Sequence, residues 1–396
     1  MMRKLQLLWS FPAAVIIRII SPIILVKTVG IRSGYIGHFI SESVEQIHLK
    51  ESRKKINKAF RRPTFRLYYF RTMPTINSFL EHKVRQSLSI SKIGKAIAHA
   101  QELLPNSAKY KDVSTANAGR FLARLDGERI EGFEFTQAEE ETAREWLRSI
   151  GWQDNQPIIC LLVRDSAYYN YGDNSESKTW EFTKFRDSNI ENYRLGVEFL
   201  LTQGFFVIRM GLKMRSPLVI QHKSFFDYAF SEQQSPFLDI WLFSKCQGII
   251  STGTGPDLLG PINNIPVLIL NALPLYGVWS FASVLWFPKH LSNAKSGKNL
   301  TLNEHLDSTF NTYNEYVENE IAIQEMSPLE IEVACKEFYN VFFAQDEPKL
   351  QNSEKQDLFW AVFRNHKRFF IDHSKVNPHA YIGESWLDTQ DHDFLT

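Results

Sequence analysis

Residues 248–260 read GIISTGTGPDLLG, in which a short apolar run enters a loop of small residues. The run at 248–251 predicts a buried strand, and Pro256 suits the first turn of a following helix. Small residues between a strand and a helix leave backbone N–H groups free, and the helix N-terminus carries about half a positive charge. The loop therefore fits a diphosphate, although an ordinary tight turn would have the same sequence. The residues that would bind the phosphates are Ser251, Thr252, Gly253, Thr254 and Gly255.

Apolar runs of strand length recur on both sides of this loop and alternate with helical stretches. We predict strands over 157–163, 205–211, 248–251 and 266–270, and helices over 190–202, 238–245 and 256–263. Strands that are apolar throughout and alternate with helices are typical of a parallel sheet covered on both faces. Ligands of such sheets bind beyond the carboxyl ends of the strands, so the polar residues after each strand are candidates for a site.

The N-terminal half shows a similar order of elements. Strands are predicted over 23–29 and 65–72, with a mostly helical stretch over 76–97. Thr136 and Glu139 form a capping box at the start of a helix that Gly151 ends, and the residues after this helix fit a domain hinge. We therefore predict an α/β protein with four parts: a membrane-associating helix at 1–22, an N-terminal domain at 23–150, a C-terminal domain at 151–345 and a helical tail at 346–396.

The composition is that of a globular chain, with 44% apolar and 22% charged residues. Its three cysteines, Cys160, Cys246 and Cys335, lie far apart, so we expect reduced thiols and no disulfide or zinc framework. The charge is unevenly distributed, because residues 1–72 carry 14 Lys and Arg against 3 Asp and Glu. A basic end indicates an anionic partner, either a membrane surface or nucleic acid. Since no nucleic-acid-binding motif accompanies the charge, we expect a membrane and no nucleic acid.

Residues 1–29 are basic and then apolar, and Arg18, Lys27 and two prolines interrupt the apolar run. No cleavage pattern of small residues closes the run, which disfavours a secretory signal. The interruptions disfavour a membrane-spanning helix, which needs about 20 apolar residues. An interfacial helix over 3–21, with Trp9 and Phe11 at the lipid boundary, fits better, and a helix that packs on the body of the protein is the alternative. We expect a cytoplasmic protein attached peripherally to the inner membrane.

Charged and polar residues follow the predicted strands of the second half. Arg164 follows a predicted strand, Arg209 lies near the end of another, and Arg186 precedes a helix. An arginine can donate two hydrogen bonds at once to a diphosphate, so all three are candidate substrate contacts. Asp165 is a candidate general base, or it orients Arg164. The structural alternatives are a salt bridge between Arg164 and Asp165, and a solvated loop with a helix cap for the segment that contains Arg186. The remaining strand-end candidates are Gly211 and Asn271.

In the N-terminal half, Gly37 and His38 follow the first predicted strand. His38 is a candidate acid, base or acceptor contact, or it caps its own helix. Asn77 follows the second strand, where it would bond a sugar hydroxyl or cap a helix. A carboxylate pair with metal-like spacing, Asp391 and Asp393, lies in the terminal tail, so we predict no metal site.

Six stretches of the sequence belong together: VRDSAYY at 163–169, FRDSNIENY at 185–193, GIISTGTGPDLLG at 248–260, PVLILNALP at 266–274, IGHF at 36–39 and PTINSFL at 74–80. As a set they resemble a family of bacterial glycosyltransferases of surface-polysaccharide biosynthesis. The resemblance implies a GT-B architecture, in which two Rossmann-like domains with parallel sheets face a central cleft. The C-terminal domain would bind a nucleotide-sugar and the N-terminal domain the acceptor. The resemblance also implies catalysis without a bound metal or other cofactor.

Arg164 also resembles the arginine of the His-x-Arg element of fucosyltransferase-like enzymes, which contacts the donor nucleotide. Leu162 stands where that element has its histidine, so Asp165 and His38 are the candidates for the catalytic base. Arg164 would stabilise the charge of the departing diphosphate. We therefore expect transfer of a sugar from a nucleotide-sugar to a surface polysaccharide or a lipid-linked glycan at the cytoplasmic face of the membrane. A nucleotide-sugar epimerase of the same fold and a non-catalytic component of a polysaccharide assembly complex are the alternatives.

Overall fold

The computed structural model describes residues 2–55, 62–112, 121–122, 130, 132–167, 184–344, 353–373 and 375–395. The chain forms two compact units, each of which contains a parallel sheet with helices packed on it. The first unit comprises Met1–Phe121 and Arg129–Phe133, and the second comprises Leu122–Glu128 and Glu134–Thr396. The predicted α/β class with parallel sheets is confirmed. The central cleft expected between two domains stays a prediction.

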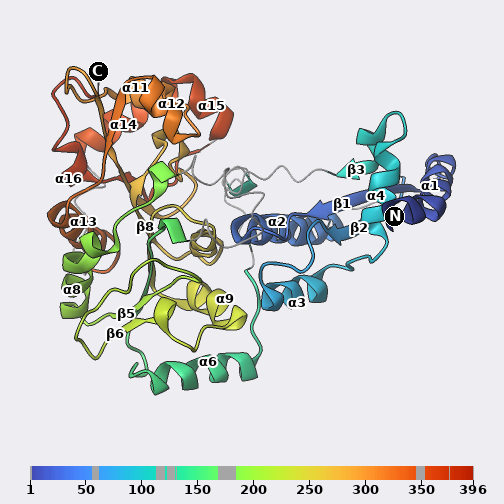
Figure 1. Ribbon diagram of the computed structural model, residues 1–396, viewed down its shortest axis with the longest axis horizontal. Coiled ribbons are helices and arrows are strands. Elements are labelled where there is room, and N and C mark those ends of the chain that lie inside the picture. Colours follow the sequence, from blue (N-terminus) through green and yellow to red (C-terminus); the bar gives the residue numbers. More distant parts are fainter. Residues whose placement is uncertain are drawn as a thin grey trace. The chain divides into compact units, whose positions relative to one another are not determined.

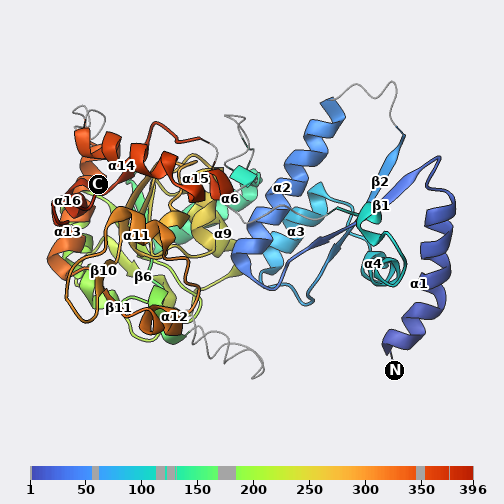
Figure 2. The same ribbon diagram turned by 90° about the horizontal axis from the view of Figure 1, so that it is seen from above.

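The first unit is built on a three-stranded parallel sheet. Its elements are α1 Met2–Ile19, β1 Leu25–Ile31, α2 Ile36–Lys55, β2 Thr64–Phe70, α3 Ser78–Ser87, α4 Gly94–Glu102 and β3 Lys111–Asp112. The strands lie in the order β2–β1–β3. In Figure 2, α2 and α3 lie on one side of β1 and β2, whereas α4 and then α1 lie on the other. Helix α1 thus packs on α4 as an outer layer of this unit.

Both strands predicted in this half are confirmed, with shifted ends. Strand β1 continues through Gly30, because the absence of a side chain there makes room for the ring of Tyr69 in β2. A Cβ at Gly30 would lie 2.7 Å from that ring. The stretch predicted as mostly helical divides into α3 and α4, since Leu88 is extended and Ile90 forms a parallel bridge with Tyr68.

The second unit is built on a seven-stranded parallel sheet. Its strands are β4 Ile158–Leu162, β5 Phe206–Arg209, β6 Phe225–Asp227, β7 Gly248–Ser251, β8 Val267–Ala272, β9 Val284–Pro288 and β12 Ala380–Ile382. The helices are α6 Gln137–Ser149, α8 Arg194–Thr202, α9 Pro236–Lys245, α10 Leu259–Ile262, α11 Leu302–Asp307, α12 Tyr313–Glu318, α13 Pro328–Phe342, α14 Glu354–Asn365, α15 Lys367–Asp372 and α16 Glu384–Leu387. A separate antiparallel pair is formed by β10 His290–Asn293 and β11 Ile321–Gln324.

Both faces of this sheet are covered, as the apolar strands predicted. Figure 1 shows α8 and α13 on one side of β5 and β8, and α9 on the other. All residues of β4, β7 and β8 are buried. The four strands predicted in this half are present as β4, β5, β7 and β8, while β6, β9 and β12 were not predicted.

The strand order fixes where a ligand is most easily bound. The strands lie in the order β6–β5–β4–β7–β8–β9–β12, so the chain moves outward from β4 in one direction and then from β7 in the other. This is the order 3-2-1-4-5-6 of Rossmann-type sheets, extended here by β12. The topological switch point lies between β4 and β7, and ligands of such sheets bind outside the carboxyl ends of the strands at that point.

Helix α6 begins with the predicted capping box, in which Thr136 and Glu139 bond reciprocally. The helix belongs to the second unit, whereas the sequence put the domain boundary after it, at 150. Its contacts account for this. Trp146 Nε1 donates to Gln233 Oε1 at 2.7 Å, and Glu140 Oε1 lies 2.7 Å from Lys245 Nζ of α9.

Candidate functional site

The loops that follow β4 and β7 meet at the switch point of the large sheet. Arg164 comes two residues after the end of β4, and Thr252 directly follows β7. The backbone N–H of Arg164 donates to Thr252 Oγ1 at 3.1 Å, which ties the two loops together. The structure therefore brings together these two residues, which are far apart in the sequence, at the edge where a ligand of this sheet would lie.

The segment before α8 brings further charges to this edge. Asp187 Oδ1 lies 3.3 Å from Arg164 Nε, and the Arg164 side chain is 12% exposed. Arg186 Nη2 donates to the backbone carbonyl of Gly253. The Ser188 N–H donates to the Arg164 carbonyl at 2.9 Å. Two guanidinium groups from different segments thus lie along the β4 and β7 loops.

Lys289 directly follows β9 and adds a cation that the sequence reading missed. Its ammonium donates to the Asp187 carbonyl at 2.6 Å and lies 3.6 Å from Glu325 Oε1. Burial lowers the pKa of Lys289, and the charges of Glu325 and Asp187 act in the opposite direction. The sequence could have indicated Lys289, because this residue directly follows an apolar run of strand length, as Arg164 does.

The small-residue loop itself is organised around Asp257, which the sequence reading also missed. Asp257 Oδ2 accepts hydrogen bonds from Ser251 Oγ at 2.7 Å and from the Thr254 N–H at 2.5 Å. Thr254 Oγ1 lies 3.4 Å from Ser251 Oγ. Gly253 has a φ of +75°, a conformation that favours glycine, while Gly255 is right-handed helical.

Asp257 is fully buried, and burial raises its pKa to about 7. The hydrogen bond from Ser251, the amide of Thr254 and the charge of Arg186 lower the pKa without offsetting burial. The Ser251 hydroxyl and the Thr254 amide, which were expected to bind phosphate, are therefore bonded to the Asp257 carboxyl group. Attraction for an anion at this edge comes from the cations around the loop more than from its amides.

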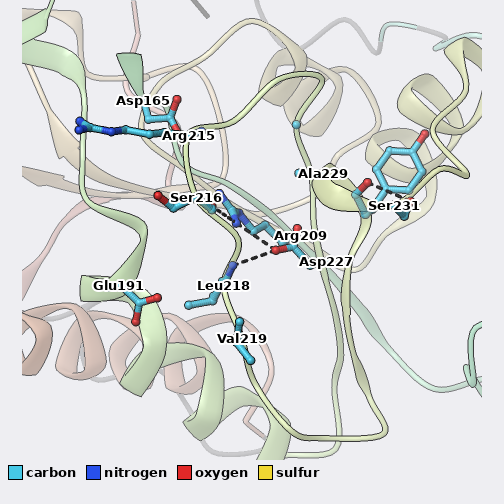
Figure 3. Close-up of polar contacts among 12 residues, drawn as sticks. Asp165, Glu191, Arg209, Arg215, Ser216, Leu218, Val219, Asp227, Ala229 and Ser231 are labelled. Atoms are coloured by element: carbon cyan, nitrogen blue, oxygen red, sulfur yellow. Dashed lines mark hydrogen bonds and ion pairs between the residues drawn. The ribbon is translucent and has the colours of Figure 1, made fainter. Parts of the chain in front are cut away.

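Asp165 orders two loops. Its Oδ1 accepts from the Ala167 N–H at 2.9 Å, and its Oδ2 accepts from the Arg215 N–H at 2.8 Å. Figure 3 shows Asp165 beside Arg215, in the loop between β5 and β6. Both carboxylate oxygens of Asp165 thus accept backbone N–H groups, whereas Arg164, which Asp165 was expected to orient, pairs with Asp187.

Arg209 turns away from the β4 and β7 loops and pairs within its own half of the sheet. It is 1% exposed, and its Nη1 donates to Asp227 Oδ2 at 3.0 Å and to the Ser216 carbonyl at 2.6 Å. The same Asp227 oxygen accepts from the Leu218 N–H at 2.9 Å (Figure 3). Arg209 and Asp227 therefore hold the loop after β5. Gly211 opens that loop with a φ of +149°.

Asn271 is buried near the end of β8 and links three segments. Its Nδ2 lies 3.3 Å from the Tyr193 hydroxyl, to which it donates, and its Oδ1 accepts from the Met326 N–H at 2.8 Å. Its φ of +54° is left-handed, which asparagine tolerates better than most residues. Asn271 thus has a clear packing role beside the candidate site.

The N-terminal candidates lie in the first unit, at the carboxyl ends of β1 and β2. Gly37 and His38 are in the first turn of α2, and His38 Nε2 lies 3.4 Å from Arg32 Nη1. Burial, and then the charge of Arg32, lower the pKa of His38. Arg32 forms an ion pair with the buried Glu42. Asn77 caps α3, since its Oδ1 accepts from the Leu80 N–H at 2.8 Å.

Among the residues that the structure describes, no group of three or more His, Cys, Asp or Glu side chains is arranged to hold a metal ion. Over the same residues, no helix has the length and apolarity required to cross a bilayer.

No protein-family model matches the sequence, and no curated protein is similar to it. Among solved structures, a glycosyl transferase of family 9 from Veillonella parvula DSM 2008 is 10% identical with a TM-score of 0.42, covering 67% of this chain and 86% of that one. The ADP-heptose lps heptosyltransferase II of E. coli is 11% identical with a TM-score of 0.35, covering 62% and 84%. The UDP-GlcNAc 2-epimerase of Neisseria meningitidis, bound to UDP-GlcNAc, is 12% identical with a TM-score of 0.30, covering 79% and 97%. These values are too low to establish a common function.

Proposed function

We propose that the second unit binds the diphosphate of a nucleotide-sugar at the switch point between β4 and β7, and that the protein is a glycosyltransferase of GT-B type. The observation that carries the proposal is the meeting of Arg164, Arg186 and the loop after β7 at this point of a Rossmann-type sheet. The resemblance of VRDSAYY, FRDSNIENY and GIISTGTGPDLLG to glycosyltransferases of surface-polysaccharide biosynthesis supports the same reading.

The charge at this edge suits a departing diphosphate. Arg164, Arg186 and Lys289 provide three cations, and Asp187 and Glu325 provide two carboxylates. Transfer of the sugar breaks its bond to the diphosphate, and negative charge develops on the leaving oxygen as the bond breaks. Fixed cations in a partly buried site stabilise that charge more strongly than water does. Asp187, paired with Arg164, holds the guanidinium in place in the free protein.

For the proton of the acceptor hydroxyl, His38 is better supported than Asp165. Both oxygens of Asp165 accept backbone N–H groups. The lowered pKa of His38 favours its neutral imidazole, which is the form that accepts a proton. The acceptor that we propose is a surface polysaccharide or a lipid-linked glycan, met at the cytoplasmic face of the inner membrane. No metal or other cofactor is part of the proposal.

The test uses the purified full-length protein, a panel of nucleotide-sugars and a bacterial glycolipid extract as the acceptor. We expect a nucleoside diphosphate and a glycosylated lipid to form together, as measured by mass spectrometry. Arg164→Ala should reduce product formation by about 10- to 100-fold, the effect expected for a hydrogen bond to a charged group. Arg148→Ala, an arginine paired on the surface of α6, is the matched control and should leave it unchanged.

Two outcomes would contradict the proposal in different ways. Conversion of a nucleotide-sugar to its epimer without any acceptor would identify an epimerase. Failure of every nucleotide-sugar to react or to bind would favour a non-catalytic component of a polysaccharide assembly.

A further inference from the structure

Helix α1 packs on the first unit through its small and polar side, opposite to the usual arrangement of an amphipathic helix. Ser10 and Ala14 are fully buried, and Ser21, just past the end of the helix, is 5% exposed. By contrast, Ile16 is 57% exposed and Ile19 is 69% exposed. The apolar side chains of α1 thus face away from the unit to which the helix is attached.

Polar contacts hold α1 in this orientation. Arg18 Nε donates to Gln101 Oε1 at 2.8 Å, and Gln101 Nε2 donates back to the Ala14 carbonyl at 3.2 Å. The Tyr110 hydroxyl donates to Ser21 Oγ at 3.1 Å, and the Arg18 guanidinium lies over the Tyr110 ring. Turning the apolar side inward would break these bonds and move Arg18 away from Gln101 and Tyr110. The exposure of the apolar side is therefore built into the packing of α1.

Most of the exposed large apolar side chains of α1 lie on one side of the helix and form a stripe, whereas Phe11, which is 40% exposed, lies outside it. At 3.6 residues per turn, Leu8, Trp9, Ile16 and Ile19 fall within an arc of roughly 100°. Ile20 and Ile23 continue the stripe beyond the end of the helix. The residues of the stripe are Leu8, Trp9, Ile16, Ile19, Ile20 and Ile23, which are between 38% and 74% exposed.

Basic side chains lie around the end of α1, where it packs on the first unit. Arg62 Nη1 donates to the Ser21 carbonyl at 2.5 Å, and Lys109 lies over the ring of Tyr110, which contacts the end of α1. Residues 1–72 as a whole carry 14 Lys and Arg against 3 Asp and Glu. An occupant of the stripe must therefore offer an apolar interior beneath an anionic surface, as a bilayer with anionic lipids does. A second copy of this chain would instead bring a second set of positive charges.

We propose that the stripe on α1 is a lipid-binding surface, with which α1 lies flat in the interface of an anionic bilayer. Trp9 suits such a position, because its indole has an apolar body and a polar N–H. The helix would enter the headgroup region without crossing the bilayer. The proposal does not depend on the donor site of the second unit, so each can fail without the other.

The test is co-sedimentation of the full-length protein with vesicles of phosphatidylethanolamine and phosphatidylglycerol. We expect wild type to bind these vesicles, and to bind phosphatidylcholine vesicles or vesicles in high salt less well. Ile16→Glu with Ile19→Glu should lower the partition coefficient by about 10- to 100-fold, because both apolar contacts are lost and negative charge is added. Ile23→Glu, which lies outside the helix, should act in the same direction.

The matched control is Val317→Glu with Leu329→Glu, which places two glutamates at apolar positions of the second unit that are 56% and 66% exposed. It should bind vesicles as wild type does, and circular dichroism should show that all variants are folded. Equal vesicle binding by wild type and the α1 variants would overturn the proposal, as would the absence of any binding by wild type. A wild-type dimer that Ile16→Glu with Ile19→Glu converts to a monomer, without vesicle binding, would identify a second copy as the occupant and also overturn it.

Discussion

The guanidinium of Arg164 and the ammonium of Lys289 are linked through one residue, Asp187, whose carboxylate meets the first and whose backbone carbonyl meets the second. Arg186 adds a third positive charge over the loop after β7. In the proposed donor site, the attraction for a diphosphate would come from long side chains that belong to separate loops. Asp257 shapes the loop from inside and occupies the Thr254 amide.

Asp257 gives a prediction about pH. Its pKa is raised to about 7 in the folded protein, compared with about 4 for an aspartate in an unfolded chain. The folded state therefore binds this proton more tightly. The contribution of the proton to stability is fully present below about pH 4 and is lost as the pH rises towards 7.

Asp257→Asn removes this titration. The free energy of unfolding, measured with urea between pH 4.5 and pH 7.5, should fall less steeply with pH in the variant than in wild type. A constant offset is also expected, because the new amide group is buried where Oδ1 has no hydrogen-bond partner among the described residues. Asp154→Asn, at an exposed position, should run parallel to wild type. Parallel curves for wild type and Asp257→Asn would show that this carboxyl does not titrate in that range.

At the scale of elements, the large sheet depends on close contact between helices that cover it. Helices α8 and α13 pack against each other on one face, and Gly196 of α8 makes this approach possible. A Cβ at this position would lie 2.6 Å from Cys335 Sγ of α13, well inside van der Waals contact. The position of α8 matters for the site, because the segment that carries Arg186 and Asp187 leads into it.

Gly196→Ala tests this packing. Alanine in a helix interior normally stabilises by about 1 kcal/mol relative to glycine. Here we expect destabilisation of about 1–3 kcal/mol, because the methyl group overlaps the Cys335 sulfur. Cys335→Ala removes that sulfur, so the double variant should be more stable than the sum of the two single effects predicts. Strict additivity in urea unfolding would contradict the close contact.

The elements also show what the sequence alone can predict. Strand β7 was predicted with its exact bounds and β4, β5 and β8 within two residues at each end, because central strands of a parallel sheet are apolar throughout. Strands β6 and β12 have three residues each and form by pairing with β5 and β9, so they carry no pattern of their own. The assignment of α6 to the second unit could not be predicted from the sequence either, because its contacts are with Gln233 and Lys245, which lie far along the chain.

For the candidate site, the sequence predicted which residues lie near the ends of strands, without the direction of each side chain. Arg164 and Thr252 do meet, whereas Arg209, the last residue of β5, pairs with Asp227 instead. The partner of Arg209 lies on β6, which was not predicted. Asp257 was read as part of a helix start, because nothing in the sequence shows that its carboxylate folds back onto Ser251.

At the scale of the whole molecule, each of the two units carries one proposed binding surface, and the two proposals are independent. The first unit carries a helix that exposes apolar side chains, in a part of the chain rich in Lys and Arg, and we propose that it binds an anionic bilayer. The second unit carries a Rossmann-type sheet with cations at its switch point, which points to a nucleoside diphosphate. A transferase that moves sugar to a lipid-linked acceptor needs both surfaces, whereas an epimerase needs only the second.

The central claim is that the switch point of the large sheet binds a nucleoside diphosphate, and calorimetric titration tests it most directly. UDP, GDP, ADP, CDP and dTDP would each be titrated into wild type, Arg164→Ala and the Arg148→Ala control. We predict that at least one nucleotide binds wild type and the control with equal affinity, and that Arg164→Ala weakens its binding by about 10- to 100-fold. Binding of none of the five to wild type, or equal binding to Arg164→Ala, would contradict the account.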